Sequence, residues 1–142
     1  MANYRCSVRT NYFHVKDEEG FREMMSHVRG CEDDVKLWEK KDDNGNTMFA
    51  FGSYGDIYGL IGADGEDEEG YYESFIKQIQ AFVEDEDAII LFESGNEKLR
   101  YLTAFATIIT SKKCDYLNIE SLAVKRAGEM LNNPLWETQC AY

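Results

Sequence analysis

The feature that most constrains the fold is a hairpin signal, "DVKLWEKKDDNGNTMFAFGSY", which covers residues 34–54. Two runs rich in strand-forming residues flank Asn44-Gly45, a pair that tolerates the positive φ angles of a type I′ turn. A two-residue turn at this point would place Trp38 and Phe51 opposite each other across the ladder. The sequence therefore predicts an antiparallel hairpin, around which the other elements must pack.

Three segments have the apolar spacing of amphipathic helices. The first follows Asp17, an N-cap residue, and keeps apolar residues at i, i+3, i+4 and i+7 before Gly30. The second covers about 68–83 and opens with acidic residues, which the helix dipole favours. The third follows the cap residue Asn118 and is expected to end before Pro134.

Further strand-like runs lie at residues 4–15, 88–93 and 99–110. The element order is therefore β-α-β-β-α-β, followed by β-α, and its first six elements match the ferredoxin-like split βαβ motif. We predict a single α+β domain over residues 1–142. It would have a ferredoxin-like βαββαβ core, extended by a β-strand and a C-terminal helix, with helices on one face of the sheet.

Charge is distributed unevenly along the chain, which has 27 acidic and 15 basic residues and a net charge of −12. Residues 17–97 carry 23 acids and 6 bases, whereas residues 98–142 carry 4 acids and 6 bases. Such a chain repels nucleic acid and anionic membranes on average. We therefore expect a basic protein partner, such as a nuclease or a DNA-binding protein, and no direct binding to nucleic acid or membrane.

The cellular setting is predicted from what the sequence lacks. No run approaches the roughly 20 apolar residues of a membrane span, and the first residues contain no apolar signal core. The four cysteines are widely spaced and form no C-x-x-C pair, which favours reduced thiols. These features predict a soluble, cytoplasmic protein.

No catalytic, metal or cofactor signature is present in the sequence. The P-loop and dinucleotide-binding spacings are missing, and counting from Asp64 puts Glu69 where a calcium loop needs its turn glycine. The two histidines, His14 and His27, offer no zinc-ligand spacing. Whether either lies beside Cys6 or Cys31 as an activated pair is left open. We expect no enzyme activity, no catalytic residues, no metal and no cofactor.

The acidic middle of the chain is the candidate binding surface. Carboxylates arranged like nucleic-acid phosphates would occupy the basic groove of a partner, and tyrosines would anchor the contact. The predicted partner-binding residues are Tyr54, Tyr58, Asp64, Glu66, Asp67, Glu68, Glu69, Tyr71, Glu84, Asp85, Glu86 and Asp87.

Three alternatives remain open at this level. The same carboxylates lie at helix ends and turns, where solvation alone accounts for them. A small-molecule-binding α+β module would instead have a pocket lined by Tyr54, Tyr58 and the second helix. An enzyme of unrecognised type would need a convergent pocket that the sequence cannot place. A homodimer is also open, because sheet edges of small domains often pair and the long first strand would be suited to it.

Three stretches, "RTNYFHVKDEEGF", "GNEKLRYLTAFATIITSK" and "NPLWETQCAY", resemble small, acidic, uncharacterised proteins of Gram-positive phages and conjugative elements. Such elements often encode inhibitors of host restriction or CRISPR nucleases, and some of these inhibitors are acidic phosphate mimics. The resemblance implies an inhibitor of a nucleic-acid-handling defence protein. It implies no catalytic residues.

Overall fold

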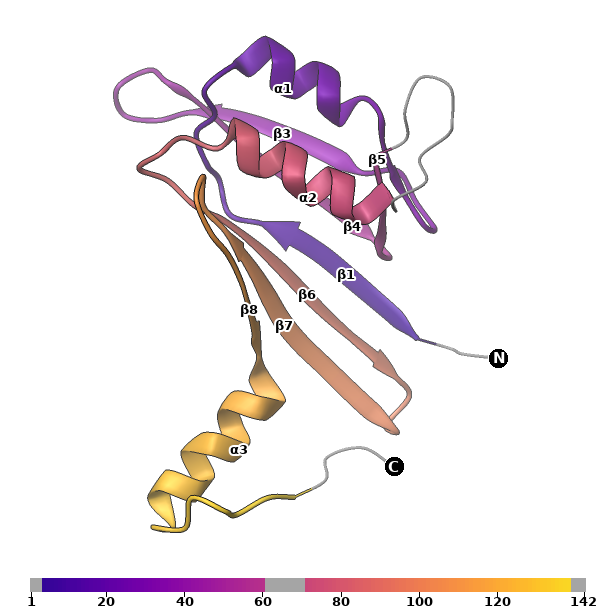
Figure 1. The fold of residues 1–142 in the computed structure, drawn as a ribbon. Coiled ribbons are helices and arrows are strands. Elements are labelled where there is room, and N and C mark those ends of the chain that lie inside the picture. Colours follow the sequence, from indigo (N-terminus) through magenta and orange to yellow (C-terminus); the bar gives the residue numbers. More distant parts are fainter. Residues whose placement is uncertain (1–3, 61–70, 139–142) are drawn as a thin grey trace.

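Six strands form one antiparallel sheet in the computed structural model, which describes residues 4–60 and 71–138, apart from the side chains of Tyr71 and Tyr101. The strand order across the sheet is β3-β4-β1-β6-β7-β8 (Figure 1). The bounds are β1 Arg5–Thr10, β3 Lys36–Lys41, β4 Thr47–Tyr54, β6 Ile89–Glu97, β7 Tyr101–Ile109 and β8 Cys114–Asn118. β1 is paired on both sides, by β4 and β6, so the prediction that the first strand offers a pairing edge is wrong.

Two helices cover one face of this sheet, and a third stands apart (Figure 1). α1 (Glu18–Met25) and α2 (Tyr71–Phe82) place Phe21, Phe75 and Ile79 in one core with side chains of β1, β4, β6 and β7. The Phe51 and Phe75 rings meet edge to face at 5.6 Å, which adds directional attraction to burial. α3 (Ile119–Met130) follows β8 at the opposite end of the molecule.

The hairpin forms, but its register differs by one residue from the prediction. Trp38 pairs with Ala50 and Leu37 with Phe51, because the Asp42 N–H donates to the Asn46 carbonyl and the loop between them has three residues, 43–45, instead of two. Within this loop only Gly45 has positive φ (+83°), and its N–H donates to the Asp42 carbonyl, as in a type I turn closed by a left-handed glycine. The extra residue shifts every pair by one position, so the Trp38–Phe51 pair and the type I′ turn are wrong.

Two further parts of the chain differ from the predictions. Asp17 caps α1 as expected, but the helix ends at Met25, and Val28–Gly30 forms a short strand, β2, that pairs with β5 (Ile57–Leu60). After the predicted βαββαβ core the chain forms two strands, β7 and β8, where one strand was predicted. Asn118 caps α3 through bonds from the Glu120 and Ser121 N–H groups, as predicted.

The prediction of an α+β domain is confirmed by this arrangement of one antiparallel sheet, a small second sheet and three helices among the described residues. The narrower ferredoxin-like description stays a prediction. Within the described part of the chain, no helix has the length and apolar character needed to cross a bilayer.

Candidate functional site

A cavity of about 600 Å³ lies between β5, the first turn of α2 and strands β6–β8, on the helix-covered face of the sheet. We call it the acid pocket. Two carboxyl groups, Glu93 and Asp56, lie among tyrosines and apolar side chains. Its lining consists of Val8, Cys31, Asp56, Ile57, Tyr58, Tyr72, Leu91, Glu93, Phe105, Thr107 and Tyr116.

The strand period brings Glu93 to this position. Successive residues of a strand point to opposite faces, so Ile89, Leu91 and Glu93 share the face that α1 and α2 cover. Ile89 and Leu91 are buried in the core, whereas Glu93 lies one step beyond it. The chain therefore places a carboxyl group at the end of an apolar row, where it is partly removed from water.

Asp56 reaches the same place from the turn between β4 and β5. Gly55 has φ +94°, a left-handed conformation that favours glycine, and its N–H donates to the Cys6 carbonyl at 2.8 Å. The Asp56 carbonyl accepts a hydrogen bond of 2.8 Å from the Cys31 N–H. The turn is thus held to both β1 and the segment after β2, which fixes the Asp56 carboxyl beside Glu93.

Burial raises the pKa of Glu93 to about 7. A hydrogen bond from the Tyr4 hydroxyl to Glu93 Oε2 (2.9 Å) acts in the opposite direction, while a hydrogen bond with Asp56 and the Asp56 charge raise the pKa further. Two adjacent carboxyl groups cannot both ionise cheaply. Near neutral pH the Glu93 carboxyl is therefore protonated in a large fraction of the molecules.

The groups around the carboxyl pair are held in their neutral forms. Burial, followed by a hydrogen bond to Asp56 (Sγ to Oδ1, 3.3 Å), raises the pKa of the Cys6 thiol to about 12. Burial likewise raises the pKa values of Tyr4 and Tyr72 to about 12. A thiol with so high a pKa is a poor nucleophile, because the thiolate is the reactive form.

One group of described residues has the geometry to hold a metal ion. Ligand atoms of Cys6, Asp56 and Glu93 lie within 4.8 Å of one another. A metal bound there would have to displace the protons of the Cys6 thiol and the Glu93 carboxyl, because thiol and carboxyl groups bind metals in their deprotonated forms. The sequence prediction of no metal did not detect this juxtaposition, since the three residues are far apart in the chain.

The histidines lie away from the thiols. His14 is held between two carboxylates, with Nε2 2.8 Å from Asp42 Oδ2 and Nδ1 2.9 Å from Asp87 Oδ2, and these hydrogen bonds raise its pKa. His27 Nε2 lies 3.3 Å from Glu23 Oε1. Within residues 4–60 and 71–138 no hydrogen bond joins a histidine to a cysteine, so these residues contain no assembled Cys-His pair.

The predicted partner-binding residues are divided between the two ends of α2. Tyr58 lines the acid pocket, and the neighbouring Tyr54 is 67% exposed. Residues 84–87 follow the C-terminal end of α2, where Asp87 binds His14 and Asp85 forms an ion pair with Lys16 at 3.0 Å. The remaining predicted positions, Asp64, Glu66, Asp67, Glu68, Glu69 and the side chain of Tyr71, lie outside the described residues.

The acid pocket contains candidate residues that the sequence analysis missed, namely Asp56, Glu93 and Tyr116. A signal for Glu93 was present, because the run "AIILFE" places it in register with two apolar core residues. Nothing in the sequence indicates that Asp56 and Tyr116 come close to it, since β5 and β8 were not predicted. The convergence depends on the observed topology.

No protein family, curated protein or solved structure matches this chain. The function must be inferred from the pocket and the surfaces themselves.

Proposed function

We propose that this chain is a non-enzymatic binding protein whose acid pocket receives the cationic group of a small organic molecule. The observation that carries the proposal is the Glu93–Asp56 carboxyl pair within an aromatic cavity. A cavity of about 600 Å³ falls within the usual size range of small-molecule sites. This is the alternative function that the tyrosines and the second helix suggested from the sequence, now centred on different residues.

The chemistry of the lining favours a cation with an attached apolar body. An ammonium or guanidinium group placed at the carboxyl pair replaces the Glu93 proton and pairs with both carboxyl groups in a partly desolvated site. Tyrosine ring faces attract cations, and Tyr58, Tyr72 and Tyr116 are each 41–52% exposed at the cavity. Phe105 and Leu91 offer an apolar surface for the rest of the molecule.

The pH dependence of binding follows from the Glu93 pKa. The cation binds the ionised pair, so the apparent affinity improves as Glu93 loses its proton. With a pKa of about 7, the ionised fraction rises about tenfold between pH 6 and pH 8. Binding should therefore tighten by about tenfold over this range and release a proton.

Calorimetric titration with tryptamine, and with tryptophol as its neutral analogue, tests the proposal. Tryptamine should bind and raise the melting temperature, while tryptophol, in which a hydroxyl replaces the ammonium, should bind at least tenfold more weakly. Glu93→Gln should abolish this preference. Glu86→Gln, which removes an exposed carboxylate beyond the other end of α2, is the matched control and should keep it. Equal binding of the two probes, or an unchanged preference in Glu93→Gln, would refute the proposal.

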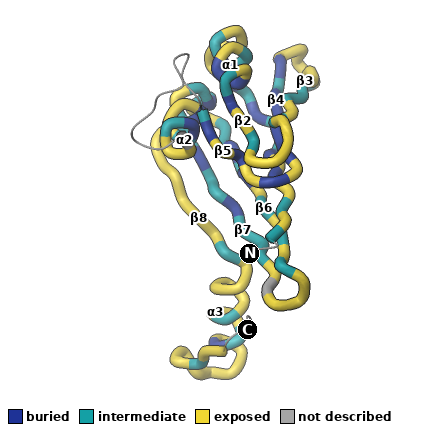
Figure 2. Tube along the Cα trace, turned by 90° about the vertical axis from the view of Figure 1, so that its right-hand side faces the viewer, coloured by how far each residue is buried: buried dark blue, intermediate teal, exposed yellow. Residues whose placement is uncertain are grey.

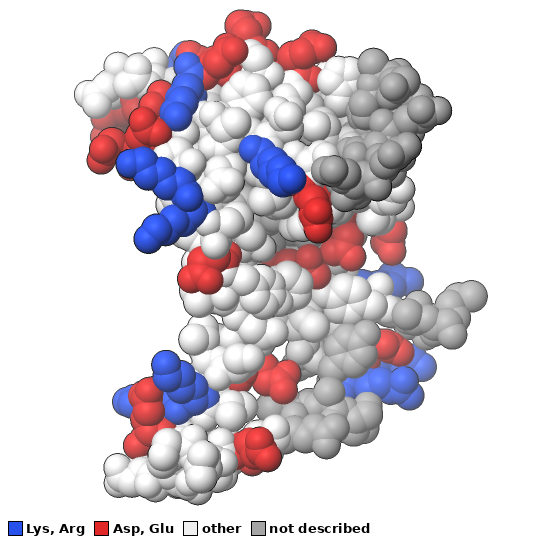
Figure 3. Space-filling view, in the orientation of Figure 1, with Lys and Arg blue, Asp and Glu red and all other residues white. Residues whose placement is uncertain are grey.

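A second function rests on the acidic surface beside the pocket. Glu32, Asp33 and Asp34 are all exposed, and Glu32 lies against Gly55, next to the exposed Tyr54. Figure 3 shows further acidic side chains at the top of the molecule, over α1 and the β3–β4 loop. We propose that this surface, together with the acidic stretch 64–69, occupies the basic groove of a nucleic-acid-handling defence protein, as the resemblance to phage and mobile-element proteins implies.

The two functions make different demands on an experiment. A phosphate mimic must be displaced from its partner by duplex DNA and by 500 mM NaCl, because both compete for the same basic groove. Replacing Glu66, Asp67, Glu68 and Glu69 by glutamine should weaken that capture while leaving tryptamine binding unchanged. Capture that withstands both DNA and salt would exclude the mimic.

A further inference from the structure

Exposed apolar side chains are segregated within the described part of the chain. Before residue 92 the large exposed ones are three tyrosines, Tyr54, Tyr58 and Tyr72. Every large exposed aliphatic side chain lies in the last third of the chain. These are Leu99, Leu102, Leu117, Ile119, Leu122, Met130, Leu131 and Leu135, and the exposed Phe92 lies with them. When exposed apolar side chains gather in one region of a protein, that region is commonly an interaction surface.

Helix α3 provides one part of this surface. Of its twelve residues only Gly128 is buried, whereas the shorter α1 buries Phe21, Met24 and Met25. α3 packs mainly against the adjacent strands β7 and β8 and projects beyond the sheet (Figures 1 and 2). A helix of this length gains most of its stability from packing an apolar face. Within the described residues, α3 leaves most of its apolar side chains exposed.

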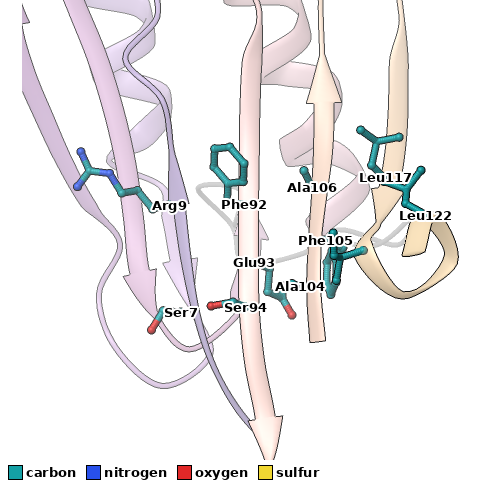
Figure 4. Close-up of a pocket in the computed structure, with 11 residues that line it drawn as sticks. Ser7, Arg9, Phe92, Glu93, Ser94, Ala104, Phe105, Ala106, Leu117 and Leu122 are labelled. Carbon is teal, nitrogen blue, oxygen red and sulfur yellow. The ribbon is translucent and has the colours of Figure 1, made fainter. Parts of the chain in front are cut away.

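The second part is an apolar groove of about 400 Å³ on the sheet face opposite α1 and α2. Strand register places Phe92, Ala106 and Leu117 in one row across β6, β7 and β8. Ser94 and Ala104 form the next row. The small residues make the floor, and Phe92 and Leu117 rise on its two sides (Figure 4). Leu122 of α3 completes the rim, so the groove is continuous with the helix.

We propose that two copies of this chain associate with the α3 helix of each copy seated in the groove of the other. Within the described residues, a helix with exposed apolar side chains lies beside an open apolar groove, which is the self-complementary surface that a two-fold dimer requires. Its own α3 starts at Ile119, on the groove's rim, and runs away from the sheet, so it leaves the floor uncovered.

The charge layout supports a second copy as the occupant. Residues 17–97 have a net charge of −17, so two copies repel each other through most of their surface. Residues 98–142, which contain α3 and most of the groove's rim, have a net charge of +2. Association through this segment holds the acidic halves apart and brings no acidic cluster into the interface.

Light scattering after size exclusion, at 100 μM chain, tests the dimer. The full chain should elute with about twice its mass of 16.4 kDa. Leu122→Asp on α3, and Ala104→Lys on the groove floor, should each weaken dimerisation by about 30-fold or more, as expected for residues at the centre of an interface. Tyr54→Asp introduces the same negative charge as Leu122→Asp, at an exposed residue that belongs neither to α3 nor to the groove lining, and should remain dimeric.

Far-UV circular dichroism of the variants separates loss of the dimer from loss of the fold. A folded, monomeric Leu122→Asp together with a folded, monomeric Ala104→Lys supports the proposal. A full chain that is monomeric at 100 μM overturns it. A dimer that survives either substitution also overturns it, because pairing of the β8 edges or contact between helices alone does not require the groove floor.

Discussion

The Glu93→Gln substitution should make stability respond differently to pH. In the folded protein the pKa of Glu93 is raised to about 7 from its ordinary value of 4.5, mainly by burial. The folded state therefore holds a proton that the unfolded state has already lost between these two pH values. Stability falls as pH rises from 4.5 to about 7 and is constant above that, whereas glutamine does not titrate.

The size of the effect follows from the same two values. The difference between 4.5 and about 7 corresponds to at most about 3–4 kcal/mol. Glu93 is only partly buried, so water screens the charge and we expect about 1–2 kcal/mol. For a chain of this length this is a shift of roughly 3–8 °C in melting temperature.

Urea denaturation of the wild type and of Glu93→Gln, from pH 4 to pH 8, measures this difference. The variant should gain about 1–2 kcal/mol on the wild type across the range, with the gain complete near pH 7. Glu86→Gln, at an exposed carboxylate, should follow the wild type in parallel. A Glu93→Gln curve parallel to the wild type within about 0.3 kcal/mol would show that Glu93 has no raised pKa.

Three other perturbations test the core, the turn and the histidine cluster. Phe75→Ala removes a fully buried ring that contacts Phe51 and should cost about 3–5 kcal/mol in urea denaturation; a cost below about 1 kcal/mol would contradict the packing. Gly45→Ala should lower the free energy of unfolding by about 1–2 kcal/mol, because φ is +83°, even though a Cβ atom would meet no neighbour there. Gly45→Asn should lower it less, since asparagine tolerates this conformation better. Hydrogen bonds to Asp42 and Asp87 raise the pKa of His14 above 6.5. Protonated His14 therefore contributes its full stabilisation below pH 6.5, and this stabilisation is lost as pH rises through the pKa of His14 in the folded protein. His14→Gln should therefore melt at a lower temperature than the wild type at acidic pH and at the same temperature above the His14 pKa. A difference in melting temperature that is independent of pH would contradict the ion pairs.

Local signals predicted the helix starts and the hairpin, because each depends on a few neighbouring residues. Asp17 and Asn118 accept hydrogen bonds from N–H groups of the helices that they precede, as their side-chain chemistry allows. The hairpin register was missed by one residue because Asp42 Oδ1 accepts from the N–H groups of both Asn44 and Asn46 and stabilises a longer loop. The competition between two turn geometries is not visible in the Asn-Gly pair alone.

Elements that depend on distant partners could not be predicted in this way. Val28–Gly30 follows the apolar spacing of α1 but pairs with β5 instead, and β8 is an almost fully exposed edge strand with no apolar pattern. The acid pocket needs β5, β8 and α2 together, so its carboxyl pair joins positions 37 residues apart. A sequence with 27 acids offers many such pairs, and only the fold selects one.

The two sites proposed for this chain use opposite faces of the same strands. On β6, Phe92 points into the groove while the adjacent Glu93 points into the acid pocket, and on β7 Ala106 and Thr107 divide in the same way. A second copy seated in the groove would therefore remove water from one face of the strands that hold the carboxyl pair on the other. Because the field of Glu93 extends through a sheet only one residue thick, covering the groove lowers the local polarity on that side and favours the protonated pair. Dimerisation and binding of a cation would then oppose each other weakly, through the ionisation of one carboxyl group.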